Sequence, residues 1–207
     1  MRGIFEHWPN RITAMRFVGS LVLFILFALN EEFGLNQEGL PTNPWYFPTC
    51  FWLFVVTALT DFLDGWMARR ENQITAFGRI ADPFVDKVLV LGSMIFLATM
   101  EWSREYMPAW IVVTVLAREF LVTGIRGYVE SLGKEFPADW FGKIKMIVQC
   151  FAIGSILSLD GLPWSDLLRG WIEVLSHVLV WATLFTSVGS GLSYVLKTGS
   201  VLSESSE

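Results

Sequence analysis

The chain has 207 residues, of which 53% are hydrophobic and only 17% are charged, and its mean hydropathy is +0.49. A soluble domain usually carries about 25% charged residues, so this composition excludes a water-soluble domain as well as a disordered chain. The net charge of −5 argues against a nucleic-acid-binding domain, and two cysteines are too few for a disulfide framework or a cysteine-based zinc cluster. We therefore expect an integral membrane protein.

Six apolar segments are candidates for membrane-spanning helices, each of which needs roughly 20 mostly apolar residues. The last segment is the clearest, because it carries no charge. Several others reach the required length only by including basic residues at one end, and long Lys and Arg side chains can extend from there to the headgroups. We predict one all-α membrane domain over residues 1–207, with six transmembrane helices built on Phe17–Leu29, Pro48–Thr60, Val88–Met100, Met107–Ile125, Met146–Leu159 and Val174–Leu196.

The distribution of Lys and Arg predicts the orientation of these helices. Thirteen of the 15 basic residues lie on one side of the predicted arrangement, and only Arg104 and Arg169 lie on the other. Because basic residues favour the cytoplasmic side, we predict a multi-pass protein of the cell (inner) membrane with both termini in the cytoplasm. The loop Asn30–Phe47 then lies outside, and we expect its last three residues, Trp45–Phe47, to form an interfacial aromatic belt.

Two pairs of carboxylates interrupt the apolar pattern around the second and third helices. Asp61 and Asp64 are three residues apart, and Asp82 and Asp86 are four apart, so each pair shares one face of a helix. Oxygen ligands select hard cations, and a pair of metal ions suits phosphoryl transfer. We predict a polar cavity at the cytoplasmic side that holds two Mg²⁺ or Mn²⁺ ions. The alternative, in which these acids only pair with Arg69, Arg79 and Lys87, remains open.

Residues of other types near the carboxylates fit a phosphate ligand. Gly65 and Ala68 are small enough to let a ligand lie against the helix, and Gly78 permits close packing. Arg69 offers a planar guanidinium group that matches phosphate geometry.

The combined pattern resembles the signature of the CDP-alcohol phosphatidyltransferase family at every fixed position, as Asp61-x2-Asp64-Gly65-x2-Ala68-Arg69-x8-Gly78-x3-Asp82-x3-Asp86. Members of that family join a CDP-linked lipid or alcohol to a second alcohol and release CMP, and they have six transmembrane helices with cytoplasmic termini. Three further stretches resemble the branch of bacterial phosphatidylglycerophosphate synthases, namely Pro9–Arg16, Ala117–Arg126 and Gly142–Gln149.

The resemblance implies the substrates CDP-diacylglycerol and sn-glycerol 3-phosphate in a membrane lipid environment, and it suggests a homodimer. It implies that Asp61, Asp64, Asp82 and Asp86 hold the two metals, and that Asp86 also takes the proton from the acceptor hydroxyl. It implies a binding site for the CDP-lipid made of Asn10, Thr13, Gly65, Ala68, Arg69, Thr75 and Gly78.

The acceptor in this reaction is a dianionic phosphate, which requires a basic pocket. We predict that it is bound by the basic residues of segment 117–149, with Glu119 orienting one of them; these residues are Arg118, Arg126, Lys143 and Lys145. Basic residues would also occur here in any membrane protein with cytoplasmic loops, so a purely topological role is the alternative.

Other functions remain open on the sequence alone. Within the family the acceptor can be inositol phosphate, serine, or phosphatidylglycerol in cardiolipin formation. A cation carrier that uses the acids as an ion path is the alternative from another class of protein. In the last helix, we expect Gly189–Ser193 to allow close helix packing or to form a dimer face, and His177 to be a packing residue.

Overall fold

The computed structural model of the chain describes residues 8–35, 41–71, 76–131 and 140–203, with side chains described at 11–35, 41–60, 84, 85, 87–131, 142, 144–196 and 198. In these ranges the chain is helical, and its only β pairing is a single bridge between Leu35 and Pro41. The helices are α1 (Trp8–Ala28), α2 (Asn30–Phe33), α3 (Tyr46–Glu71), α4 (Ala76–Thr99), α5 (Ala109–Ser131), α6 (Trp140–Gly161) and α7 (Asp166–Ser203).

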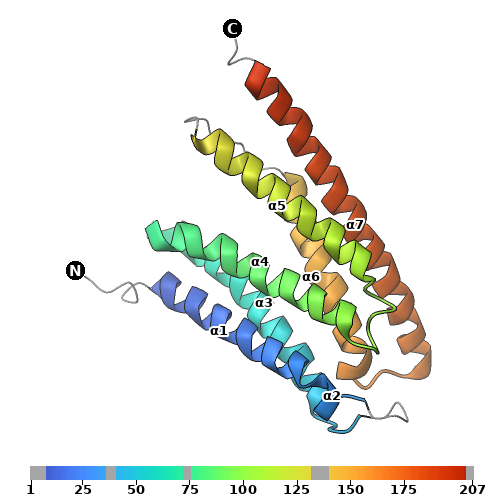
Figure 1. Cartoon of the computed structure of the whole chain (residues 1–207). Helices are drawn as coiled ribbons and strands as arrows, with labels where there is room; N and C mark the ends of the chain where they lie inside the picture. Colours follow the sequence, from blue (N-terminus) through green and yellow to red (C-terminus); the bar gives the residue numbers. More distant parts are fainter. Residues whose placement is uncertain (1–7, 36–40, 72–75, 132–139, 204–207) are drawn as a thin grey trace.

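The six long helices form one bundle (Figure 1). Helix α6 lies between the group α1, α3 and α4 and the pair α5 and α7. Helix α1 packs against α3 and α4, α5 packs against α7, and α6 lies against both α3 and α7. Helix α1 begins and α7 ends toward the same end of the bundle, whereas α2 and the α4–α5 and α6–α7 connections lie at the opposite end (Figure 1). Arg104 and Arg169, in or beside those two connections, therefore lie away from the end where α3 leads into α4.

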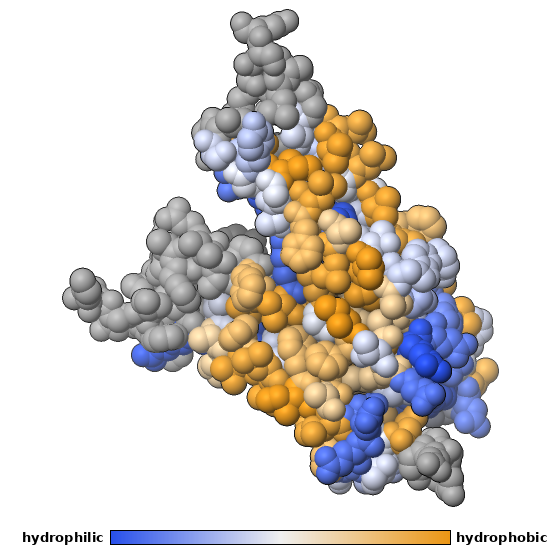
Figure 2. Space-filling view, in the orientation of Figure 1, coloured by the Kyte–Doolittle hydropathy of each residue, from blue (hydrophilic) through white to orange (hydrophobic). Residues whose placement is uncertain are grey.

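The helices carry the apolar surface of a membrane protein. Among the residues that the structure describes, three helices have stretches long and apolar enough to cross a bilayer, at Arg11–Ala28, Ile144–Gly161 and Asp166–Leu196. Shorter apolar stretches, Tyr46–Thr60 and Lys87–Thr99, lie in α3 and α4. Hydrophobic residues cover much of the face in Figure 2, and hydrophilic ones gather mainly at the end with the α4–α5 and α6–α7 connections. The predicted all-α fold is confirmed for the part of the chain that the structure describes.

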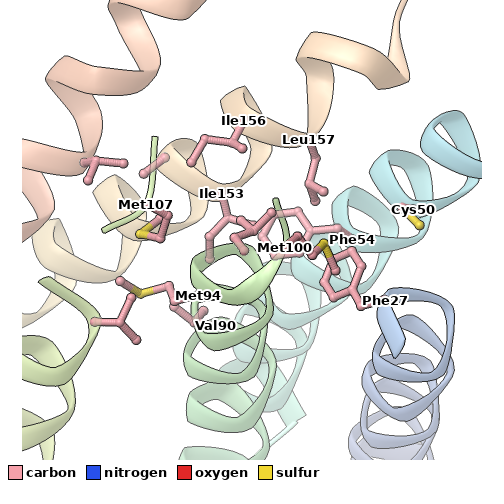
Figure 3. Packing of buried hydrophobic residues seen from close by; sticks show 14 of the residues in the cluster. Phe27, Cys50, Phe54, Val90, Met94, Met100, Met107, Ile153, Ile156 and Leu157 are labelled. Atoms are coloured by element: carbon pink, nitrogen blue, oxygen red, sulfur yellow. The ribbon is translucent and has the colours of Figure 1, made fainter. Parts of the chain in front are cut away.

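The core forms because buried residues recur every three or four positions, which places them on one face of each helix. In α1 this face carries Ser20, Leu23 and Phe27, and in α3 it carries Cys50 and Phe54, all nearly inaccessible to solvent. Figure 3 shows side chains of α1, α3, α4 and α6 converging on this core.

The predicted interfacial belt is wrong for two of its three aromatic residues. Trp45 is exposed at 75%, but Tyr46 and Phe47 are only 5% and 1% exposed. The Tyr46 hydroxyl donates a hydrogen bond to the Leu26 carbonyl at 3.0 Å, and the Phe47 ring packs edge-on against Trp102 at a centroid distance of 5.2 Å. These two residues begin α3, and they contact the end of α1 and the α4–α5 connection.

Candidate active site

The residues of the family signature lie on two helices that follow one another directly. Helix α3 carries positions 61, 64, 65, 68 and 69 in its last part, and α4 carries positions 78, 82 and 86 in its first part. The side chains of these residues and of Asn10 lie outside the described part of the chain, as does Thr75 entirely. The structure therefore describes the backbone helices that carry the predicted metal ligands but none of the ligand side chains. Among the described residues, no three His, Cys, Asp or Glu side chains gather into a metal site.

Thr13 is the member of the predicted CDP-lipid site whose side chain the structure describes. It is 4% exposed, and Arg16, one turn further along α1, is 3% exposed. Both lie on the buried face that continues to Ser20 and Leu23. The first turns of α1 thus direct polar residues into the bundle, where a polar ligand would need them.

Two of the four predicted acceptor residues, Arg118 and Lys145, meet around a buried carboxylate, and we call Lys87, Arg118, Glu119 and Lys145 the Glu119 cluster. Arg118 Nη1 donates to Glu119 Oε1 at 2.6 Å, and Lys145 Nζ of α6 hydrogen-bonds to the same oxygen. Lys87 Nζ of α4 lies 3.9 Å from Glu119 Oε2. The side chains of Arg118, Glu119 and Lys145 are only 9%, 7% and 8% exposed. Glu119 therefore orients two predicted binding residues rather than one, and it brings in a third cation from α4.

The charges of the Glu119 cluster favour an anionic ligand. Arg118 and Lys145 are both nearly buried and face one carboxylate, which leaves a surplus of one positive charge in the buried part of the cluster, while Lys87 adds a cation that is 41% exposed. Burial makes such a surplus costly unless an anion compensates it. Two buried donors, Arg118 Nε and Gln149 Nε2, also have no hydrogen-bond partner among the described residues. A dianionic phosphate with additional oxygen acceptors would satisfy both requirements.

Helix α7 supports the basic residues of α5. The Ser190 hydroxyl accepts a hydrogen bond from Arg118 Nη2 at 2.8 Å, and the Tyr194 hydroxyl accepts one from Arg126 Nη2 at 2.7 Å. The Tyr194 ring centre also lies 5.9 Å and 5.8 Å from the guanidinium carbons of these two arginines, within range of a cation–π interaction. Arg118 and Arg126 therefore share one side of α5, as their spacing predicts.

Gly191 gives Arg118 the space that it needs. A Cβ atom at position 191 would lie 2.9 Å from Arg118 Cγ, whereas one at Gly189 would meet no heavy atom within 4 Å. Ser190 and Gly191 are buried against α5 inside the chain, so the prediction that this patch forms a dimer face is wrong for these two residues. The prediction of close helix packing is confirmed for Gly191.

Four residues of the site were not among those predicted to bind the acceptor: Lys87, Gln149, Ser190 and Tyr194. For Lys87 and Gln149 a signal existed, since Lys87 directly follows Asp86 and Gln149 lies one turn after Lys145. For Ser190 and Tyr194 the only signal was a polar stripe on an otherwise apolar helix. Of the predicted set, the side chain of Lys143 lies outside the described residues. His177, predicted to be a packing residue, is exposed on α7, and its ring centroid lies 5.1 Å from that of Tyr106.

Comparison with known proteins shows the family to which the chain belongs. The chain matches the family described as CDP-alcohol phosphatidyltransferase over residues 6–189. It is 31% identical to the CDP-diacylglycerol–glycerol-3-phosphate 3-phosphatidyltransferase of Bacillus subtilis, over 95% of this chain and 97% of the relative. Proteins of the same name from Rickettsia bellii and Shigella flexneri serotype 5b are 31% and 32% identical, over 91% and 69% of this chain and 93% and 74% of their own lengths. The chain belongs to the CDP-alcohol phosphatidyltransferase family.

Proposed function

We propose that this chain transfers the phosphatidyl group of CDP-diacylglycerol to sn-glycerol 3-phosphate, giving phosphatidylglycerophosphate and CMP. The relatives named for this reaction align over nearly their whole length with the chain. The single structural observation that carries the choice of acceptor is the Glu119 cluster, because its two buried cations, Arg118 and Lys145, outnumber its one carboxylate and so favour an anionic phosphate.

We propose that Asp61, Asp64, Asp82 and Asp86 hold two Mg²⁺ or Mn²⁺ ions. The helical register of α3 supports this, because positions 61 and 64 continue the spacing of the buried residues Phe54 and Thr57. On α4, positions 82 and 86 share the register of Leu89 and Ser93, which are buried. This shared register is what supports a common site for the two carboxylate pairs. Bound there, divalent ions would neutralise the diphosphate of the donor and stabilise the departing CMP.

The nucleotide of the donor lipid would lie between α1 and the signature residues at the end of α3 and the start of α4. The buried polar face that begins with Thr13 supports a place for α1 in this site. We propose that the nucleotide portion is bound by Asn10, Thr13, Gly65, Ala68, Arg69, Thr75 and Gly78.

The acceptor phosphate would bind to Arg118, Arg126, Lys143 and Lys145, with Glu119 as the residue that positions Arg118 and Lys145. The 1-hydroxyl oxygen of the acceptor then forms a bond to the lipid-side phosphorus of the donor. The bond from that phosphorus to the oxygen of CMP breaks, and the hydroxyl proton passes to the Asp86 carboxylate. Deprotonation of the acceptor as it attacks is general-base catalysis.

We also propose six membrane spans, with both termini and the active site on the cytoplasmic side of the inner membrane. The alternating course of the six long helices and the place of Arg104 and Arg169 at the opposite end support this orientation. Residues 1–207 then form a single catalytic domain. Light scattering of the purified protein would measure whether it is the homodimer that its family resemblance implies.

The proposed acceptor is tested by measuring CMP release from CDP-diacylglycerol by the full chain in mixed micelles. Glycerol 3-phosphate should give the highest kcat/KM among acceptors that include inositol phosphate, serine and phosphatidylglycerol. Faster turnover with another acceptor would overturn the assignment, and ion flux without any CMP release would favour a carrier.

A pair of matched variants tests the binding site. Lys145→Gln should raise the KM for glycerol 3-phosphate about tenfold or more, since a hydrogen bond to a charged group contributes about 1.5–3 kcal/mol, and it should change the KM for the donor much less. Arg104→Gln, a change in an exposed cation of the opposite end, is the control. Equal effects on both substrates would contradict the acceptor site.

A further inference from the structure

An open groove of about 600 Å³ lies between α1, α4 and α5, and Lys87 and Glu119 of the Glu119 cluster form part of its lining. Its walls are mainly apolar and include Phe24 of α1, Phe84 and Leu91 of α4, and Phe120 of α5. Phe84 and Phe120 are 60% and 72% exposed, so the groove opens to the surroundings of the bundle. In a bilayer this is the surface that lipid chains contact. We call it the α4–α5 groove, after the two helices that line most of it.

The Phe24 side chain of α1 forms the inner wall of the groove. A Cβ atom at Gly92 would lie 2.2 Å from Phe24 Cζ, so the absence of a side chain at 92 lets the Phe24 ring lie against α4. The same ring stacks on Phe96 with a centroid distance of 5.6 Å. Both contacts come from α4, so the Phe24 ring packs against that helix and forms an apolar wall of the groove.

The groove is distinct from the proposed donor site. Its α4 residues Phe84, Lys87 and Leu91 recur at helical spacing on one face of that helix. Leu89 and Ser93, on the opposite face, are buried, and positions 82 and 86 belong to their register. A lipid in the groove would therefore lie across α4 from the proposed metal site.

One cation of the Glu119 cluster faces the groove. Lys87 is 41% exposed in its side chain, and its Nζ donates a hydrogen bond to Thr123 Oγ1 at 2.6 Å. Lys87, Glu119 and Thr123 all line the groove. The Glu119 carboxylate already receives hydrogen bonds from Arg118 and Lys145, so among the described side chains Lys87 has only this shared carboxylate, at 3.9 Å, to offset its charge. An ammonium group beside an apolar groove between transmembrane helices is complementary to an anionic lipid.

We propose that the α4–α5 groove binds an acyl chain of a resident anionic phospholipid, with the lipid phosphate at Lys87 Nζ. This inference goes beyond the proposed function and does not depend on it. A zwitterionic lipid carries its own cation beside its phosphate, so it gains less from Lys87. One lysine near a membrane surface should favour the anionic lipid by about fivefold.

The test is photo-crosslinking in phosphatidylcholine vesicles that contain the full chain. The two probes are phosphatidylglycerol and phosphatidylcholine with the same diazirine-bearing acyl chain, and peptide mass spectrometry locates the adducts. The phosphatidylglycerol probe should label peptides containing Phe84, Leu91 or Phe120 about fivefold more than the phosphatidylcholine probe does. Leu91→Trp, which fills the groove, should remove this labelling, whereas Leu121→Trp, on the exposed surface of α5 outside the groove lining, should retain it.

A second variant tests the headgroup contact without filling the groove. Lys87→Gln should bring the labelling ratio of the two probes close to one while chain labelling persists. Equal labelling by both probes in the unmodified chain would overturn the proposal, as would labelling that Leu91→Trp leaves unchanged. Displacement of the probe by CDP-diacylglycerol, but not by unlabelled phosphatidylglycerol, would assign the groove to the donor lipid and would also overturn it.

Discussion

Replacing Glu119 by Gln should separate the structural and the binding roles of the Glu119 cluster. The substitution preserves the size of the side chain but removes the carboxylate that Arg118 and Lys145 share. All three side chains are less than 10% exposed, so solvent screens their interaction little. Breaking a buried ion pair costs about 3–5 kcal/mol, and we expect the lower value because the Gln carbonyl still accepts one hydrogen bond.

For a chain of this length, about 3 kcal/mol corresponds to a fall of about 6–12 °C in the apparent Tm. The two cations, no longer held together, should also separate and raise the KM for glycerol 3-phosphate. Thermal unfolding in detergent and steady-state CMP release measure the two effects. Glu130→Gln is the matched control, since Glu130 is an exposed carboxylate on the same helix. A Glu119→Gln variant with the Tm and KM of this control would refute the role of the cluster.

Three further variants test other parts of the site. Gly191→Ala should lower activity and stability because its Cβ would lie 2.9 Å from the stem of Arg118, whereas Gly189→Ala, with open space around it, should change neither in the same assays. Tyr194→Phe keeps the aromatic ring but loses the hydroxyl that accepts a hydrogen bond, so the KM for glycerol 3-phosphate should rise about two- to tenfold with an unchanged KM for the donor. Asp86→Asn should insert into the membrane normally yet release no CMP, and substantial remaining turnover would exclude Asp86 as the base.

The helices and the basic residues of the site could be predicted because their signals are local. Long apolar segments predict spanning helices, and the spacing of Arg118 and Arg126 places them on one side of α5, where both approach Tyr194. The residue type alone indicates that these arginines can bind phosphate. For the same reason the two carboxylate pairs could be assigned to shared helix faces from their spacing.

The partners of those residues could not be predicted because they come from distant helices. Lys145 and Glu119 are 26 residues apart, and Arg118 and Ser190 are 72 apart, so only the packing of α5, α6 and α7 brings them together. Ser and Gly are common in membrane helices, so the sequence alone does not distinguish Ser190 and Gly191, which contact Arg118, from residues that only pack helices together. A run of aromatic residues likewise does not reveal which rings turn inward, and this explains the error at Tyr46 and Phe47.

The most direct test of the central claim is the stoichiometry of Mn²⁺ bound by the purified full chain, measured by electron paramagnetic resonance in the presence of CDP-diacylglycerol. The carboxylates at positions 61, 64, 82 and 86 should together hold two ions per chain. The same measurement on Asp61→Asn and on Asp82→Asn should show a loss of bound Mn²⁺ in each variant. Binding that neither substitution alters would contradict a metal site shared by the ends of α3 and α4.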